Sequence, residues 1–106
     1  MTFNPLHAHG LSKTRYAVEL LATMDAPLRA RLQSAIWEFG MADDAQHHPP
    51  ALWPEAHAIH QDATHIAGEQ NEGSIAATLN AMSSEELMRL AERLFSYYVK
   101  LAEGED

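Results

Sequence analysis

The residues best suited to chemistry recur at helical spacing in the middle of the chain. His57 and His60 are three residues apart, which makes them neighbours on one face of a helix. Asp62, His65 and Glu69 follow at spacings of three and four and would share a second face. Imidazole and carboxylate groups are ligands for zinc, nickel, copper and iron. The spacing therefore gives the hypothesis of a divalent transition-metal site, although nothing in the sequence requires a cofactor.

The alternative interpretation of these residues is a solvated polar face of the helix. A metal site in a helix bundle needs ligands that point inward from several facing helices. The remaining histidines fall in segments without apolar periodicity, and we interpret the adjacent pair His47 and His48 as exposed loop residues.

No arrangement of nucleophile and base stands out along the chain. The sequence has no cysteine, which excludes disulfides, thiolate metal sites and cysteine nucleophiles. It contains no Gly-x-Ser-x-Gly motif, and its five glycines form no phosphate-binding loop. The residues thus give no positive support for catalysis. A small helical enzyme, or a subunit of one, remains a second alternative after the metal-binding bundle.

The charge pattern has a long gap in its positive residues. No Lys or Arg occurs between Arg31 and Arg89, whereas carboxylates are frequent there, and the whole chain has a net charge of −8. A surface built from this stretch would be electronegative, with histidine as its source of positive charge. Such a field repels phosphates and argues against a nucleic-acid partner. The negative charge favours a protein partner with a basic surface. We expect that partner to use Trp53 as an anchor and to contact the carboxylates of Asp43, Asp44, Glu55, Asp62, Glu69 and Glu72.

The aromatic residues leave one alternative open. Trp53 lies between prolines, where a rigid ring could anchor a partner or fold back over the end of the bundle as a hydrophobic staple. We favour the staple, because a chain of this size needs its large apolar groups in the core. Trp37 adjoins an apolar stripe and is interpreted as boundary core. Of the adjacent pair Tyr97 and Tyr98, we expect Tyr97 to be the exposed one.

Length and composition predict one globular domain that spans residues 1–106. Apolar residues make up 46% of the chain, but no apolar run is long enough for a membrane span. The first residues lack the basic and apolar segments of a secretion signal, so a cytoplasmic location is the default expectation.

The apolar periodicity predicts an all-α fold, a compact bundle of four to five helices with no strand. Residues 1–10 are expected to be an irregular lead-in with Ser12 as the first cap, and residues 104–106 an acidic tail. Ser83 and Glu86 have the spacing of a capping box at the start of the last helix. The expected helices are 12–24, 26–39, 52–71, 74–82 and 84–103.

These observations favour an acidic, helical protein-interaction module of a regulatory, inhibitory or immunity type. The alanine-rich third helix would also allow close packing against a second copy of the chain, so a homo-oligomer is a further expectation.

Overall fold

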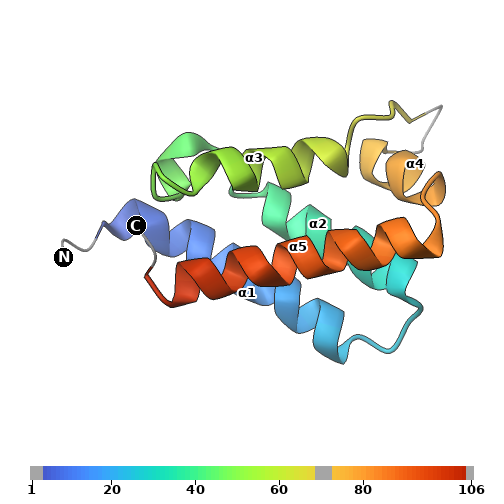
Figure 1. The fold of residues 1–106 in the computed structure, drawn as a ribbon, viewed down its shortest axis with the longest axis horizontal. Coiled ribbons are helices and arrows are strands. Elements are labelled where there is room, and N and C mark those ends of the chain that lie inside the picture. The colour runs from blue at the N-terminus through green and yellow to red at the C-terminus, as the bar shows by residue number, and fades with distance from the viewer. Residues whose placement is uncertain (1–3, 69–72, 105–106) are drawn as a thin grey trace.

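The structure, a computed structural model, describes residues 4–68 and 73–104 (Figure 1). In these ranges it has five α-helices, one short 3-10 helix and no strand, which confirms the predicted all-α bundle. None of the described helices is long and apolar enough to cross a membrane. The elements are α1 (Pro5–Thr23), α2 (Leu28–Gly40), η1 (Ala45–His47), α3 (Trp53–Asp62), α4 (Ser74–Asn80) and α5 (Ser84–Ala102).

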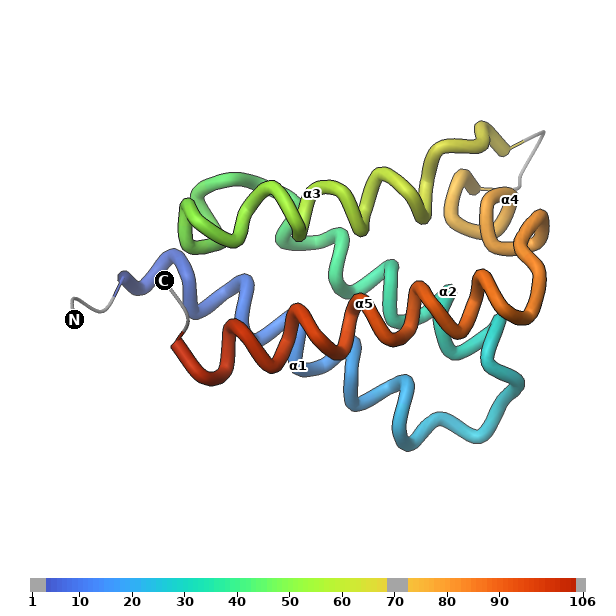
Figure 2. The backbone as a smooth tube through the Cα atoms, in the orientation of Figure 1, coloured from blue at the N-terminus to red at the C-terminus, as the bar shows by residue number. Residues whose placement is uncertain are grey.

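The four long helices run in alternating directions, with the short α4 between α3 and α5 (Figure 2). Helix α1 packs most extensively on α2, and α5 packs against α1, α2 and α3. Each helix contributes apolar side chains to one continuous core, whose large, fully buried members are Leu32, Ile36, Phe39, Ile59, Leu79, Leu94 and Tyr97.

The expected irregular lead-in over residues 1–10 is wrong from Pro5 onwards, where α1 begins, and its residues 1–3 lie outside the described part of the chain. The side chain of Asn4 accepts a hydrogen bond from the Leu6 amide at 3.0 Å and so caps the helix. Pro5 suits the first helical position, where its missing amide hydrogen costs nothing. Ser12, the predicted cap, lies inside the helix. The proline therefore marked the start of α1 rather than a loop.

The third helix is shorter than the predicted 52–71, since α3 ends at Asp62. The Thr64 hydroxyl donates to the His60 carbonyl at 2.8 Å, and the Ile66 amide donates to the Thr78 hydroxyl at 3.0 Å. These bonds turn the chain towards α4 instead of continuing the helix. Ala56, Ile59 and Ala63 of this segment are buried in the core. Residues 69–71 of the predicted helix lie outside the described part of the chain.

Helix α5 confirms its predicted boundaries to within one residue. Ser83 and Glu86 form the capping box, and Gly104 follows the helix with a positive φ of 72°. The expectation for the two tyrosines is wrong: Tyr97 is fully buried, because it continues the stripe of Leu87, Leu90 and Leu94 at spacings of three and four.

Candidate functional site

The four predicted metal ligands that the structure describes, His57, His60, Asp62 and His65, do not form one cluster. Asp62 instead pairs with Arg93 at 2.8 Å, and His65 Nδ1 lies 3.1 Å from the Asp62 carbonyl. Glu69 lies outside the described residues. Within residues 4–68 and 73–104, no group of three or more His, Asp or Glu side chains has a geometry that could hold a metal ion. The helical spacing failed as a guide at His65 because α3 ends before it.

The two histidines that do remain on α3 meet a carboxylate from the preceding loop. His57 Nδ1 lies 3.4 Å from Asp43 Oδ1, and His60 Nδ1 lies 3.1 Å from Asp43 Oδ2. Asp43 thus bridges both imidazoles and joins α3 to the end of α2.

Basic residues of α5 neutralise part of the predicted acidic surface. Lys100 of α5 lies 2.8 Å from Glu55, and Arg93 pairs with Asp62. Asp44 accepts a hydrogen bond from the Gln46 amide at 3.1 Å and caps η1. Glu72, like Glu69, lies outside the described residues. The stretch without Lys or Arg in the sequence therefore has basic side chains of α5 beside its carboxylates in the fold, because α5 packs against α3.

His48 is buried, contrary to its interpretation as an exposed loop residue. Its side chain is 1% exposed, with Nδ1 2.6 Å from the Tyr97 hydroxyl and Nε2 2.9 Å from the Ala42 carbonyl. A carbonyl only accepts, so Nε2 carries the hydrogen and the Tyr97 hydroxyl donates to Nδ1. Both ring nitrogens of a neutral imidazole are satisfied by this arrangement.

Trp53 packs between the imidazole rings of His48 and His57. Its ring centroid lies 4.9 Å from that of His57 in a stacked arrangement and 5.6 Å from that of His48. Trp53 is half-buried and packs against the hydrophobic core. This geometry supports the staple interpretation over the partner anchor, because the ring is occupied by contacts within the chain.

Burial lowers the pKa of His48, and this effect exceeds the opposing influence of the Ala42 carbonyl. The unfolded chain therefore binds a proton at His48 more readily than the folded chain does. We expect the stability contributed by neutral His48 to be intact above pH 6.5, its usual pKa, and to be lost as the pH falls towards the lower folded value. Urea unfolding at a series of pH values would measure this, and His48→Gln should flatten the dependence below pH 6.5. An unchanged dependence in the variant would contradict it.

Trp37 is the most prominent apolar residue on the described surface. Its side chain is 61% exposed, so its interpretation as boundary core is wrong. The residues one turn before it, Gln33 and Ser34, are polar, and one turn after it lies the half-exposed Met41. Trp37 therefore stands on the outer face of α2, about 100° around the helix from the buried Ile36.

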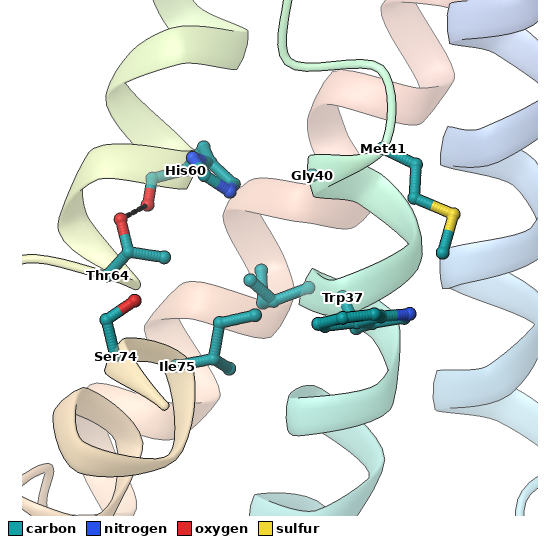
Figure 3. Close-up of a pocket in the computed structure, with 8 residues that line it drawn as sticks. Trp37, Gly40, Met41, His60, Thr64, Ser74 and Ile75 are labelled. Carbon is teal, nitrogen blue, oxygen red and sulfur yellow. Dashed lines mark hydrogen bonds between the residues drawn. The ribbon is translucent and has the colours of Figure 1, made fainter. Parts of the chain in front are cut away.

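Three adjoining hollows of about 350, 350 and 370 Å³ are each lined by Trp37. One lies against α1 at Tyr16 and Leu20, and another against α4 at Ile75 and Ala76. The third reaches α3 at His60 (Figure 3). We call this surface the Trp37 groove; its principal residues are Tyr16, Leu20, Gln33, Ile36, Trp37, Gly40, Met41, His60, Thr64, Ser74 and Ile75.

The α3 wall of the groove depends on a glycine. A Cβ atom on Gly40 would lie 2.6 Å from His60 Nε2, so only glycine lets the imidazole approach α2 this closely. Figure 3 shows His60 opposite Gly40, with Ser74 and Ile75 on the α4 side. The contact between His60 and Asp43 holds the ring from its other edge.

The sequence offered a weak signal for this groove. The buried stripe of α2 runs through Leu32, Ile36 and Phe39, and Trp37 is off that stripe. A large aromatic residue on a polar helix face is a candidate contact residue, but sequence alone does not show that α1 and α4 leave it uncovered.

Comparison of the chain with protein-family models, curated proteins and solved structures finds no significant match.

Proposed function

We propose that this protein is an acidic, helical interaction module that binds an apolar segment of a basic protein partner in the Trp37 groove. The observation that carries the proposal is the exposure of Trp37 at the centre of three adjoining hollows. Tryptophan is the residue type most enriched among those that dominate binding energy at protein interfaces.

The apolar surroundings of Trp37 support this role. Tyr16 is 45% exposed and Met41 is 47% exposed, and both line hollows that Trp37 shares. Single exposed apolar residues are ordinary on protein surfaces, whereas contiguous ones around a hollow mark interaction sites. The polar groups His60, Thr64 and Ser74 at one end would orient a partner by hydrogen bonding.

Charge favours a basic partner over a second copy of the chain. Two copies, each with a net charge of −8 over the whole chain, would repel each other. A partner with Lys and Arg beside its apolar residues is attracted by the same field, which speeds encounter and selects against acidic proteins.

Selection from a displayed library of random linear peptides tests the proposal directly. We expect the enriched peptides to combine apolar and basic residues and to lose at least about tenfold in affinity for Trp37→Ala, as is typical when a central tryptophan is truncated. Phe95→Ala is the matched control, because Phe95 is a similarly exposed aromatic residue, 54% exposed, on α5. Peptides that bind both variants equally well, or a selection that yields none, would overturn the proposal.

A further inference from the structure

The segment between α2 and α3 is attached to the bundle through histidines. This segment, residues 41–52, contains η1, and we call it the η1 loop. Among the described residues, five polar side-chain contacts join it to α1, α3 and α5, and each contact uses an imidazole. The contacts are His9 Nε2 to the Met41 carbonyl at 3.4 Å, His47 Nδ1 to the Leu6 carbonyl at 3.2 Å, His48 Nδ1 to the Tyr97 hydroxyl at 2.6 Å, and His57 Nδ1 and His60 Nδ1 to the Asp43 carboxylate at 3.4 and 3.1 Å. Because histidine changes its charge in mild acid, the attachment of the loop responds to pH.

Protonation weakens the contact of the η1 loop with α5. His48 Nδ1 accepts the hydrogen of the Tyr97 hydroxyl, so a proton on Nδ1 puts a second donor where the acceptor was. Burial, together with the charge of Glu55, raises the pKa of Tyr97, so the phenol stays un-ionised. The resulting imidazolium would be 1% exposed beside the uncharged rings of Phe39 from α2 and Trp53 from α3. A buried cation whose neighbours are uncharged is costly.

The contact of the loop with α1 is also weakened by positive charge. The rings of His9 on α1 and His47 in the loop meet edge to face, with their centroids 4.6 Å apart. Two imidazolium ions at that separation repel each other. His7 lies on the same helix and acts on His48 as a like charge. Acid therefore accumulates positive charge where the loop meets α1.

The charges around His48 favour its neutral form while the loop is closed. Burial has the largest influence on the pKa of His48 and lowers it. The Ala42 carbonyl and the Asp43 carboxylate raise this pKa, and positive charge on His47 and His7 lowers it. In an open loop the imidazole is hydrated and regains its usual pKa of 6.5. Opening therefore takes up a proton as the pH falls below 6.5 towards the lower value of the closed loop, and acid favours the open form.

The contact of the loop with α3 responds in the opposite direction. Asp43 lies between His57 and His60, so protonation of either imidazole gives a charge-assisted hydrogen bond to the carboxylate. Helix α3 is itself joined to α5 by the ion pair of Asp62 and Arg93. Acid thus weakens the attachment to α1 and α5 but strengthens the attachment to α3. This asymmetry favours a local opening that pivots near Asp43 over unfolding of the bundle.

We propose that the η1 loop is an acid-sensitive latch, which detaches from α1 and α5 when His48 is protonated and stays attached to α3 through Asp43. Detachment uncovers the rings of Phe39 and Tyr97, which are buried beside His48 in the closed loop. The inference does not rest on the Trp37 groove or on the partner proposed for it.

Thiol labelling separates opening of the loop from unfolding of the bundle. The chain has no cysteine, so Ala42→Cys places a single thiol in the η1 loop and Ala35→Cys places one in α2, and both alanines are fully buried. The labelling rate with dithiodipyridine is divided by the rate of the same variant unfolded in urea at the same pH, which removes the titration of the thiol itself. We expect this ratio for Ala42→Cys to rise by up to about tenfold per pH unit below pH 6.5, as one proton is taken up on opening.

The dependence on urea identifies the opening as local. Below the unfolding transition, the ratio for Ala42→Cys should change little with urea, because a local opening exposes little surface. The ratio for Ala35→Cys should be much lower and should rise steeply with urea, because that thiol reacts after unfolding. Equal ratios with equal urea dependence at the two positions would overturn the latch, and so would an Ala42→Cys ratio that does not change with pH.

Substitution of His48 in the Ala42→Cys protein tests the origin of the pH response. His48→Gln keeps hydrogen-bonding groups but does not titrate, so most of the acid acceleration should disappear. His65→Gln is the matched control, because His65 is exposed and lies outside the loop, and it should keep the full acceleration. Equal acceleration in both variants would overturn the role of His48.

Tyr97→Phe provides a second variant in case the His48→Gln protein does not fold. It removes the hydroxyl that binds the neutral imidazole, so labelling of Ala42→Cys at neutral pH should become faster by about fivefold or more. An unchanged rate would show that the contact with α5 does not hold the loop closed, and the proposal would be wrong.

Discussion

Replacing Gly10 by Ala is expected to destabilise the folded protein by about 2–3 kcal/mol, the usual cost of forcing an extra group into a packed interface. Gly10 is buried in α1, and a Cβ atom there would overlap the carbonyl oxygen of His47 in η1. A backbone oxygen cannot rotate away as a side chain can, so α1 and the loop before α3 would have to separate. In an unobstructed helix interior, replacing Gly by Ala stabilises the protein by about 1 kcal/mol. The effect predicted at Gly10 therefore has the opposite sign.

Urea unfolding of the two proteins measures this difference. Gly40→Ala provides a graded comparison, because its Cβ atom would meet the His60 imidazole, a side chain that can turn aside by giving up its 3.1 Å contact with Asp43. We expect Gly40→Ala to stay within about 1 kcal/mol of the wild type, since improved helix propensity offsets the displaced contact. A Gly10→Ala protein as stable as the wild type would mean that α1 and η1 do not pack as closely as the structure describes.

The helix periodicity explains why so much of the fold is predictable from sequence. The stripe of Leu32, Ile36 and Phe39 and the stripe that runs from Leu87 to Leu94 identify α2 and α5, because their spacing leaves one apolar face to bury. The errors lie where local signals compete. Pro5 reads as a loop residue but opens α1, and the apolar pattern after Asp62 continues although hydrogen bonds from Thr64 and Ile66 turn the chain.

The site was less predictable because it depends on contacts between residues far apart in sequence. His48 is buried by residues from several elements, among them Tyr97 of α5, which is 49 residues away in the sequence, and the rings of Phe39 and Trp53. Asp62, one of the predicted metal ligands, instead forms an ion pair with Arg93 of α5. Trp37 lies exposed because α1 and α4 leave a gap over α2, and no pattern within α2 encodes that gap. Periodicity shows which face a helix buries, but not which neighbours cover its other faces.

Replacing His48 by Ala is expected to cost about 3 kcal/mol of stability, as a buried side chain of this size is lost together with its hydrogen bonds. The Ala42 carbonyl and the Tyr97 hydroxyl would lose their partners in a buried setting. The rings of Phe39 and Trp53, whose centroids lie 6.1 and 5.6 Å from that of His48, would lose packing contacts. His65→Ala is the control, because His65 is exposed and its removal should change stability by less than about 0.5 kcal/mol.

A double-mutant cycle with Tyr97→Phe isolates the hydrogen bond between the two side chains. Tyr97→Phe alone leaves His48 Nδ1 as a buried acceptor without its donor, which should cost about 1–2 kcal/mol. After His48→Ala the hydroxyl has no imidazole to meet, so adding Tyr97→Phe should cost little and could recover stability. The two changes should therefore be non-additive by at least about 1 kcal/mol in urea unfolding. Additive losses would show that the 2.6 Å contact contributes no coupling and that His48 stabilises the fold through packing and the Ala42 carbonyl alone.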